Sequence, residues 1–343
     1  MRAVVLGGVG DLHIEDRPFP NAPPGGIVVR MAFVGICGSD VRNWRHGSSR
    51  LAGAQVPGHE VVGEVVRSDN TSVSVGERVG ICPGAPCLDC PRCAAGQANL
   101  CPNRIVLGYD FAGGMQQEFA IPAASIAAGC VVPIPPTLAP RTAVLAEPLH
   151  TVINGQDLAR VGPGDSVLVV GLGTIGTLHA AYAHSLRARS VLAVDIRPER
   201  VDRAAGVLGG DLVGAVPPDG ASAIRARSGA DGWSVVIIAA GVPAAVRLAL
   251  DTVEASGRVL AFAGLSPAEA VVPVDMNRIH YRQIELIGAF GGTPSTYLRA
   301  VTWLADTSYR LSLMVSDEYP LERAEEAYLN VEAGGGLKTV LRG

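Results

Sequence analysis

Four cysteines in one short segment have the spacing of a metal-binding loop. They follow the pattern C-x2-C-x2-C-x7-C within APCLDCPRCAAGQANLCP, as Cys87, Cys90, Cys93 and Cys101. Four thiolates close around Zn²⁺ as a tetrahedron with no vacant position, which is typical of a structural rather than a catalytic site. Such a site contributes of order 10 kcal/mol to a lobe with little apolar core of its own. An iron–sulfur cluster is the alternative, and elemental analysis separates it from zinc.

A second chemical signal is the glycine-rich segment GLGTIG at 171–176, placed where a predicted strand ends and a helix begins. There the glycines permit a tight turn, close approach of a pyrophosphate and close packing of the helix on the sheet. Asp195 closes the next predicted strand 19 residues after Gly176, where a carboxylate accepts hydrogen bonds from a ribose 2′-hydroxyl. The pattern predicts that NAD binds at Gly171, Gly173, Thr174, Ile175, Gly176 and Asp195.

Two basic residues after this strand keep the choice of dinucleotide open. Arg197 and Arg200 are near enough to Asp195 in sequence to meet a 2′-phosphate, so NADP is the alternative to NAD. Arg200 can also lie against the adenine, and we include it among the candidate cofactor-binding residues. The acidic residue at position 195 favours NAD, because it repels a 2′-phosphate.

A more dispersed set of residues could form an open metal site: Cys37 in GICGSD, His59 and Glu60 in PGHE, and Glu147 in LAEPLH. Beside a cofactor that accepts hydride, Cys37 and His59 with one of the two carboxylates would hold zinc and leave a position for water or substrate. An alcohol of pKa near ~16 must lose its proton to release hydride. Zinc lowers the pKa of a bound oxygen to about 7, a difference of roughly 12 kcal/mol. No unassisted side chain matches that stabilisation.

The segments that must position these residues show two patterns. From about residue 27 to 130, short β-branched runs alternate with Gly, Pro and Asp, which predicts an irregular β domain. Beyond residue 161, continuous apolar runs alternate with helical patterns, which predicts a parallel sheet with helices on both faces. After residue 291, two helices and a last strand are expected to return to the first domain. The six predicted strands of the parallel sheet cover residues 166–171, 190–195, 211–216, 235–241, 258–264 and 284–290.

Length and composition limit the function classes. At 343 residues the chain should form about two domains, and 48% hydrophobic with 17% charged residues excludes a disordered chain. A net charge of −4 offers no broad footprint for nucleic acid or an anionic membrane. Residues 166–186 lack charged side chains, but their glycines indicate a strand, a turn and a helix rather than a membrane span. No signal peptide is recognised, so a cytoplasmic protein with reduced cysteines is expected.

Together, these motifs resemble those of the zinc-dependent medium-chain dehydrogenases. GICGSD, the GHE at 58–60, the four-cysteine lobe, the EP at 147–148 and GLGTIG occur in the order seen in that family, and 274–294 is similar to its sorbitol and threonine dehydrogenase branch. The resemblance implies an α/β protein with a GroES-like catalytic zinc domain at 1–150 and 292–343 and a doubly wound Rossmann NAD-binding domain at 151–291. It implies an active site in the cleft between them, and a homodimer or homotetramer that pairs through the strand near 284–290.

The resemblance also implies roles for single residues. Cys37, His59 and Glu60 match zinc-ligand positions, and Glu147 matches a carboxylate that approaches or exchanges onto the metal. Ser39 matches the hydroxyl that binds the substrate oxygen and passes its proton towards the nicotinamide ribose. With the four-cysteine site, the chain is expected to bind two Zn²⁺, one catalytic and one structural.

Departures from the family pattern concern the substrate side of the site. Arg42 and Asn43 stand where polyol dehydrogenases commonly have His and Tyr, so a relay histidine is replaced by a group that cannot lose its proton. Arg42 could instead meet a carboxylate or phosphate. His150, three residues after Glu147, is a candidate relay residue, although a helix-packing histidine is the alternative.

Two glycines suggest an unusual substrate pocket. The Arg-Tyr pair that binds linear polyols in sorbitol dehydrogenases aligns with Gly291 and Gly292, which predicts a wider pocket. Trp44 and Phe290 are candidates to line it, and core packing is the alternative for either residue. We therefore expect an oxidoreductase that transfers hydride between NAD and a secondary alcohol of a polyol, cyclitol, aminocyclitol or sugar derivative. A threonine-type hydroxy amino acid dehydrogenase, a zinc-assisted elimination enzyme that retains NAD, and a non-catalytic NAD-binding protein are the alternatives.

Overall fold

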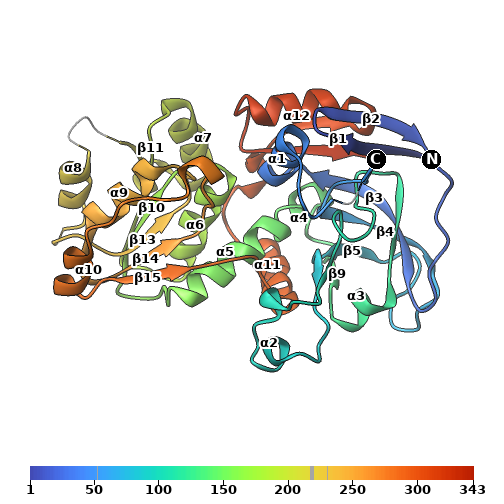
Figure 1. The fold of residues 1–343 in the computed structure, drawn as a ribbon, viewed down its shortest axis with the longest axis horizontal. Helices are drawn as coiled ribbons and strands as arrows, with labels where there is room; N and C mark the ends of the chain where they lie inside the picture. Colours follow the sequence, from blue (N-terminus) through green and yellow to red (C-terminus); the bar gives the residue numbers. More distant parts are fainter. Residues whose placement is uncertain (52, 217–219, 230) are drawn as a thin grey trace. The chain divides into compact units, whose positions relative to one another are not determined.

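Two units, each built around its own sheet, make up the chain (Figure 1). The computed structural model describes residues 1–51, 53–216, 220–229 and 231–343. Unit 1 comprises Met1–His150 and Gly292–Gly343, and unit 2 comprises Thr151–Gly291. Both ends of the chain therefore belong to the same unit.

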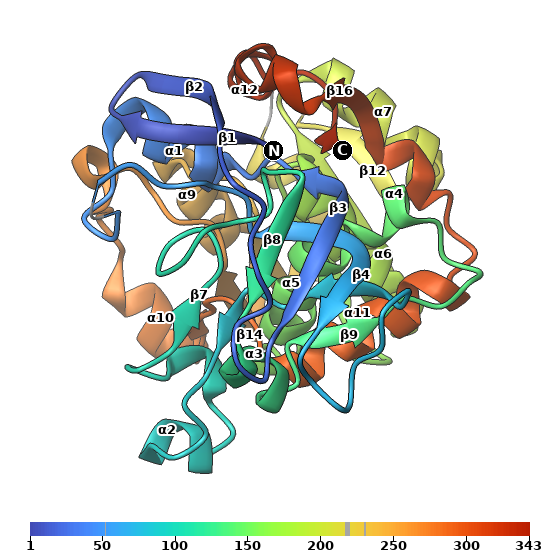
Figure 2. The same cartoon turned by 90° about the vertical axis from the view of Figure 1, so that its right-hand side faces the viewer.

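The sheets of unit 1 contain strands from both of its chain segments. These are β1 (Arg2–Gly8), β2 (Asp11–Asp16), β3 (Ile27–Gly35), β4 (Glu60–Ser68), β5 (Arg78–Ile81), β6 (Gly84–Ala85), β7 (Ile105–Val106), β8 (Glu118–Ile121), β9 (Val131–Pro133), β16 (Val315–Pro320) and β17 (Lys338–Arg342). The seven-stranded sheet has the order β16-β17-β3-β4-β5-β9, with β8 beside β3. One edge of β3 pairs first with β8 and then with β17, and its other edge pairs with β4 (Figure 2). Separate pairs form between β1 and β2 and between β6 and β7.

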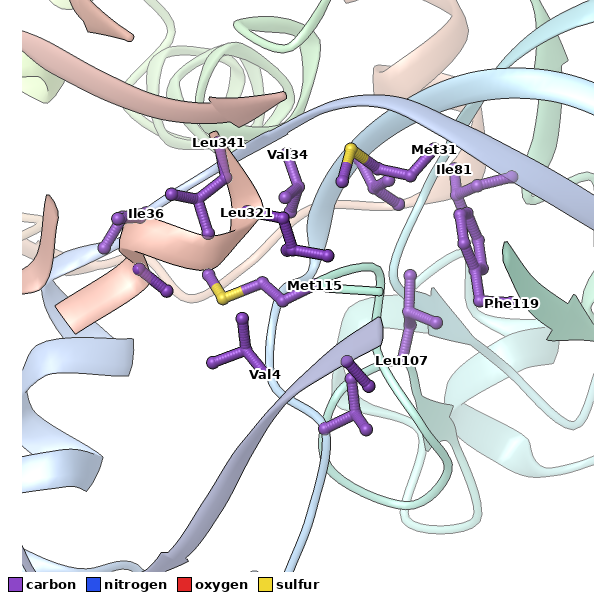
Figure 3. Packing of buried hydrophobic residues seen from close by; sticks show 14 of the residues in the cluster. Val4, Met31, Val34, Ile36, Ile81, Leu107, Met115, Phe119, Leu321 and Leu341 are labelled. Atoms are coloured by element: carbon purple, nitrogen blue, oxygen red, sulfur yellow. The ribbon is translucent and has the colours of Figure 1, made fainter. Parts of the chain in front are cut away.

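One apolar core holds unit 1 together. Figure 3 shows side chains from β1, β3, β5, β8, β17 and the 3₁₀ turn η5 (Leu321–Arg323) converging in it. Met115 and Phe119 are fully buried, and so is Leu341 near the C-terminus. Because burial of such side chains is the main favourable term in folding, the last strand is part of what stabilises this unit.

Unit 2 is a doubly wound parallel sheet. Its strands are β10 (Ser166–Val170), β11 (Ser190–Asp195), β12 (Val213–Ala215), β13 (Trp233–Ile238), β14 (Val253–Ala261) and β15 (Glu285–Gly288). They lie in the order β12-β11-β10-β13-β14-β15, and each neighbouring pair is parallel. All residues of β10 are buried, which explains its continuous apolar sequence. The strand order reverses between β10 and β13, where open α/β sheets bind their ligands.

Helices connect these strands, and two of the helices in unit 2 begin with a proline. In unit 2 the proline at the start of α7 and of α9 suits a first helical turn, where its missing N–H has no partner to lose. α5 runs across the boundary between the units. The helices are α1 (Gly38–His46), α2 (Pro91–Ala94), α3 (Ala123–Ala127), α4 (Pro140–Ala143), α5 (Ala146–Leu158), α6 (Thr174–Ser185), α7 (Pro198–Leu208), α8 (Ala221–Ala226), α9 (Pro243–Thr252), α10 (Met276–Arg282), α11 (Pro294–Asp306) and α12 (Ala324–Glu332), with 3₁₀ turns η1 (Ala98–Leu100), η2 (Gly210–Leu212), η3 (Pro267–Glu269) and η4 (Leu311–Met314).

The structure confirms the predicted α/β class and differs from the sequence analysis in details. The run 211–216 begins as η2, and only Val213–Ala215 form a strand. The tail contains β16 as well as the expected two helices and last strand, and this strand escaped prediction because most of its residues are not buried. Residues 166–186 form β10, a turn and α6, and none of the described helices has the length and apolar character needed to cross a membrane.

The core of unit 1 gives a test of these contacts. Phe119→Ala should lower the free energy of unfolding by about 3–5 kcal/mol, because it leaves a cavity in a close-packed interior. Phe19→Ala is the control, since Phe19 is 58% exposed and its truncation should change stability by less than about 0.5 kcal/mol. Urea unfolding followed by circular dichroism measures both. Equal effects of the two substitutions would contradict the described core.

Candidate functional site

The four cysteines of the predicted lobe lie together between β6 and β7. Cys90 precedes the first turn of α2, Cys93 lies within it, and Cys101 follows η1. Sγ–Sγ distances are 3.5 Å for Cys90–Cys93, 3.8 Å for Cys90–Cys101 and 3.4 Å for Cys101–Cys87. Zn–S bonds of 2.3 Å in a tetrahedron place sulfur atoms about 3.8 Å apart. The observed spacing therefore fits one zinc ion coordinated by four sulfur atoms.

Local hydrogen bonds also prepare this lobe for a cation. The backbone N–H of Asp89 and the thiol of Cys101 lower the pKa of Cys87 to about 6. The backbone N–H of Cys87 in turn donates to Cys101 Sγ at 3.4 Å. These hydrogen bonds favour the thiolate of Cys87, and a thiolate is the form of cysteine that binds metal.

A second cluster in unit 1 joins Cys37, His59 and Glu60. One donor atom from each of these residues lies within 4.8 Å of the others. The pairing of β3 with β4 brings them together, because Gly35 is opposite Glu60 and Cys37 follows β3 by two residues. Gly35 must lack a side chain, since a Cβ there would overlap Glu60 Oε2. Thiolate, imidazole and carboxylate are all zinc ligands, and three protein ligands are typical of an open, catalytic site.

Asp40 and Lys338, which the sequence analysis missed, hold these donors in place. Asp40 Oδ2 accepts the backbone N–H of Cys37 at 2.9 Å, and Asp40 Oδ1 lies 3.5 Å from His59 Nδ1. This orientation leaves Nε2 of His59 free for a metal. Lys338 Nζ forms a buried ion pair with Glu60 Oε2 and donates to Ile36 O at 3.2 Å.

The sequence contained a signal for Lys338. It is the sole lysine of the chain, whose other basic residues are all arginine. A lone lysine among arginines draws attention to its position, because a compact ammonium group and a planar guanidinium are not interchangeable. Asp40 had a weaker signal, because it lies in GICGSD but is also the third residue of α1, where acidic residues are common for helix capping.

The electrostatics of the cluster favour a cation. Burial by itself lowers the pKa of His59, but the Asp40 carboxylate and Cys37 outweigh it and hold that pKa well above its usual value. Burial also raises the pKa of Glu147 to about 7, and the nearby carboxylates of Glu60 and Asp40 add to this effect. Several negative groups in a small buried volume thus stabilise positive charge, which fits the zinc ion implied by the donor set.

Glu147 and His150 extend the same site from α5. Glu147 is buried, but it is not part of the group of three donors within 4.8 Å. His150 is also buried, its ring contacts Tyr297 with centroids 5.5 Å apart, and its Nδ1 contacts the backbone oxygen of Glu147. Burial lowers the pKa of His150 to about 4, so its ring is neutral at pH 7. The geometry favours Glu60 as the third donor.

The remaining predicted residues of unit 1 have mixed placements. Ser39 is half-buried beside the cluster, with its N–H 3.5 Å from Cys37 Sγ. Arg42 is exposed, whereas Asn43 Nδ2 donates to the hydroxyl of Tyr109 at 3.2 Å. The sequence analysis missed Tyr109, whose ring lies 5.9 Å from that of His59.

Two expectations about the substrate pocket need correction. Trp44 is 2% exposed and packs edge-on against Tyr328, so it belongs to the core rather than to a pocket wall. The position of Gly292 is not empty either, because the ring of His150 fills the space that a side chain there would occupy. Phe290 lies in unit 2 and is exposed.

In unit 2, the three glycines of the turn before α6 each lack a side chain for a different physical reason. Gly171 has φ 109°, a conformation that other residues rarely adopt. A Cβ on Gly176 would overlap the carbonyl oxygen of Gly171, whereas a Cβ on Gly173 meets no atom within 4 Å. The space above Gly173 is therefore open to a ligand at the N-terminus of α6, which begins with Thr174 and Ile175 and favours an anion.

A pocket of about 350 Å³ lies beside this turn, lined by Asp195, Arg200 and apolar residues that include Val194, Ala240 and Leu248. Asp195 ends β11 and is buried. Its Oδ2 accepts the N–H of Leu172 at 2.8 Å and its Oδ1 accepts the N–H of Arg197 at 2.9 Å. Arg200 Nη1 lies 3.5 Å from Asp195 Oδ2. A mostly apolar pocket whose lining includes a carboxylate fits an adenosine group.

The fold and these sites define a class of protein, an oxidoreductase with a zinc-binding β unit and a dinucleotide-type parallel-sheet unit. Residues 23–136 match the alcohol dehydrogenase GroES-like domain, and residues 174–306 match the zinc-binding dehydrogenase domain. The chain belongs to the zinc-dependent alcohol dehydrogenase family. This confirms the resemblance in the motifs.

Individual relatives agree with this assignment. A protein described as probable D-xylulose reductase A of Aspergillus terreus is 30% identical over 352 residues, covering 99% of this chain and 97% of that protein. The sorbitol dehydrogenase of Bacillus subtilis is 29% identical over 339 residues, covering 95% and 92%. The crystal structure of L-idonate 5-dehydrogenase from Escherichia coli has a TM-score of 0.89 at 26% identity and covers 100% of this chain and 98% of that one.

The contrast between two glycines can be tested. Gly176→Ala should lower the stability of the protein by about 1–3 kcal/mol, because the added methyl overlaps the Gly171 carbonyl. Gly173→Ala is the matched control and should leave the thermal midpoint unchanged, since Gly173 has an extended backbone and free space. Differential scanning calorimetry measures both midpoints. A larger loss for Gly173→Ala would contradict the described turn.

Proposed function

We propose that this protein oxidises a secondary hydroxyl of a polyhydroxylated small molecule with NAD as the hydride acceptor. The observation that carries the proposal is the open Cys37–His59–Glu60 cluster in a chain that also contains the dinucleotide turn before α6. The relatives named above act on polyols and sugars by their descriptions, which supports this substrate class. Substrates include polyols, cyclitols, aminocyclitols and sugar derivatives.

The residues of unit 1 have distinct tasks in this reaction. Cys37, His59 and Glu60 hold a zinc ion, which when bound supplies the Lewis acid that lowers the pKa of an alcohol. Asp40 orients His59, and Lys338 balances the charge of Glu60. The cluster of Cys87, Cys90, Cys93 and Cys101 holds a second, structural zinc.

Removal of the substrate proton requires a group near this cluster that can accept it. Ser39 is the nearest predicted candidate, because its backbone N–H contacts Cys37 Sγ and its side chain is half-buried. Glu147, a buried carboxyl group near this cluster, is a second group that can take up a proton. Arg42 is exposed and cannot lose its proton, so it has no place in this relay.

NAD is proposed as the cofactor of unit 2. Gly171, Gly173, Thr174, Ile175 and Gly176 form the turn for its pyrophosphate, and the adenosine group fits the pocket lined by Asp195 and Arg200. The Asp195 carboxylate accepts hydrogen bonds from the ribose 2′-hydroxyl and repels a 2′-phosphate.

Association of copies and location follow from two further features. β15 is an edge strand of the unit 2 sheet with Leu286 54% exposed, and an exposed apolar edge favours pairing with a second strand. We propose that two copies pair there, as a dimer or as part of a tetramer.

All seven cysteines are free thiols, which supports a reducing compartment, the cytoplasm.

The function is tested by zinc content and NADH formation. The wild-type protein should contain two zinc ions per chain and raise the absorbance at 340 nm with polyols and NAD. Cys37→Ala should retain only the structural zinc, and its turnover should fall by at least about 10³-fold, because the zinc ion that binds the substrate is lost. Cys93→Ala is the matched control. It should also lose one zinc, but its main effect should be reduced stability of the protein rather than loss of turnover.

Two outcomes would contradict the proposal. Full activity of Cys37→Ala would exclude the open zinc site from the reaction. Turnover of a polyol without net NADH would instead support an elimination enzyme that retains NAD.

The cofactor choice has its own test. Asp195→Asn removes the charge and keeps an acceptor oxygen for one of the two backbone N–H groups, at 172 and 197, that bond to the carboxylate. It should reduce the preference for NAD over NADP by about tenfold, because the repulsion of the 2′-phosphate is lost. The measurement is kcat/KM with each dinucleotide, and Asp202→Ala, an exposed acidic residue on α7, is the control. A wild-type preference for NADP would overturn the assignment.

A further inference from the structure

Gly292 and His150 occupy one another's space. A Cβ on Gly292 would overlap Cδ2 of the His150 ring and lie 2.9 Å from its Nε2. Real Cβ atoms do not approach this closely, so no residue with a side chain fits at 292 while the imidazole holds its present position. The glycine is therefore a condition for the orientation of His150, rather than a source of empty volume.

The backbone of α5 fixes the tautomer of this imidazole. Nδ1 of His150 contacts the backbone oxygen of Glu147. A carbonyl oxygen only accepts hydrogen bonds, so Nδ1 must carry the proton, and Nε2 of the neutral ring has a lone pair. No residue in the described part of the chain donates a hydrogen bond to Nε2. The ring thus has an unused acceptor.

His150 shares a face of α5 with Glu147, which lies near the open cluster of Cys37, His59 and Glu60. Residues three apart in a helix share a face, and His150 is three residues after Glu147, whose carboxylate is close enough to His59, Glu60 and Lys338 to be influenced by their charges. The positive charge of His59 also reaches His150. Tyr297 packs against the ring and restricts its rotation.

We propose that Nε2 of His150 accepts a hydrogen bond from a second hydroxyl of the substrate, and that Gly292 permits this contact. His150 is then a specificity-determining residue that favours alcohols with a neighbouring hydroxyl over simple alcohols. This inference rests on the proposed oxidation of polyols. It differs from a proton relay, because a ring with Nδ1 bonded to a carbonyl oxygen has no path to pass a proton onward.

The test compares a polyol with an alcohol that lacks a second hydroxyl. We would measure kcat/KM for xylitol, sorbitol and myo-inositol, and for 2-butanol, in wild type and His150→Phe. Phe keeps a planar ring against Tyr297 but has no acceptor. The ratio of kcat/KM for the best polyol to that for 2-butanol should fall at least about tenfold, mainly through KM of the polyol, because 2-butanol has no second hydroxyl that could lose a hydrogen bond.

Three variants serve as further comparisons. His150→Asn, which keeps an acceptor, should retain part of the preference for the polyol. Gly292→Ala should lose the preference as His150→Phe does, but its additional effect on the polyol ratio should be smaller in a His150→Ala background, where the ring is absent and only the contact with the backbone oxygen of residue 150 remains. His179→Phe is the matched control, because His179 is also fully buried but lies on α6 in unit 2, and its ratio should equal that of wild type.

A spectroscopic measurement is independent of activity. Two-bond ¹⁵N–¹H correlation spectra of histidine-labelled protein should show the Nδ1–H tautomer for His150, assigned by its loss in His150→Phe, with an Nε2 shift that moves when the polyol is added.

The outcomes distinguish a failure of the proposed role of His150 from a failure of the proposed polyol oxidation. NADH formation with an unchanged polyol ratio in His150→Phe, or the opposite tautomer, would overturn only this inference. No NADH with any alcohol would overturn the proposed function and this inference with it.

Discussion

The ion pair between Lys338 and Glu60 connects the two chain segments of unit 1 at the point where chemistry is expected. Lys338 begins β17, the last strand, and Glu60 begins β4. Both side chains are almost fully buried, and burying a single unpaired charge costs several kcal/mol. The site therefore tolerates the Glu60 carboxylate only when the C-terminal strand is in place beside β3.

The same constraint explains other features of unit 1. β17 pairs with the last residues of β3, and Ile36, which follows β3, provides the backbone oxygen for Lys338 Nζ. Gly35 leaves room for the Glu60 carboxylate and for the stem of Lys338. The strand that carries the charge balance is thus also a core strand, so stability and the electrostatics of the site depend on one another. This coupling accounts for a domain formed from two separate chain segments.

Prediction from sequence succeeded where ligands are local. The four-cysteine lobe spans 15 residues, from 87 to 101, and the turn before α6 is one uninterrupted motif, so spacing along the chain reflects spacing in three dimensions. It missed Lys338 and Tyr109, because each contacts a site residue that is distant in sequence. It missed Asp40, because an acidic residue at the start of a helix is also explained by helix capping. Trp44 shows the reverse error, since an aromatic residue near a predicted site can equally pack in the core. The expectation of a wide pocket was wrong at Gly292, because the ring of His150 fills that volume. A missing side chain in the sequence does not show which other side chain takes its place.

By itself, the sequence determined the α/β class, the two sets of zinc donors, and the glycine turn with its acidic residue, because these depend on residue types at short, regular spacing. Only the tertiary structure decided which carboxylate lies beside Cys37 and His59, which residue balances its charge, and which nitrogen of His150 is left as an acceptor. These properties depend on distances between strands and helices far apart in sequence. Burial and hydrogen bonding, which set the charge and tautomer of each group, exist only once those elements have packed.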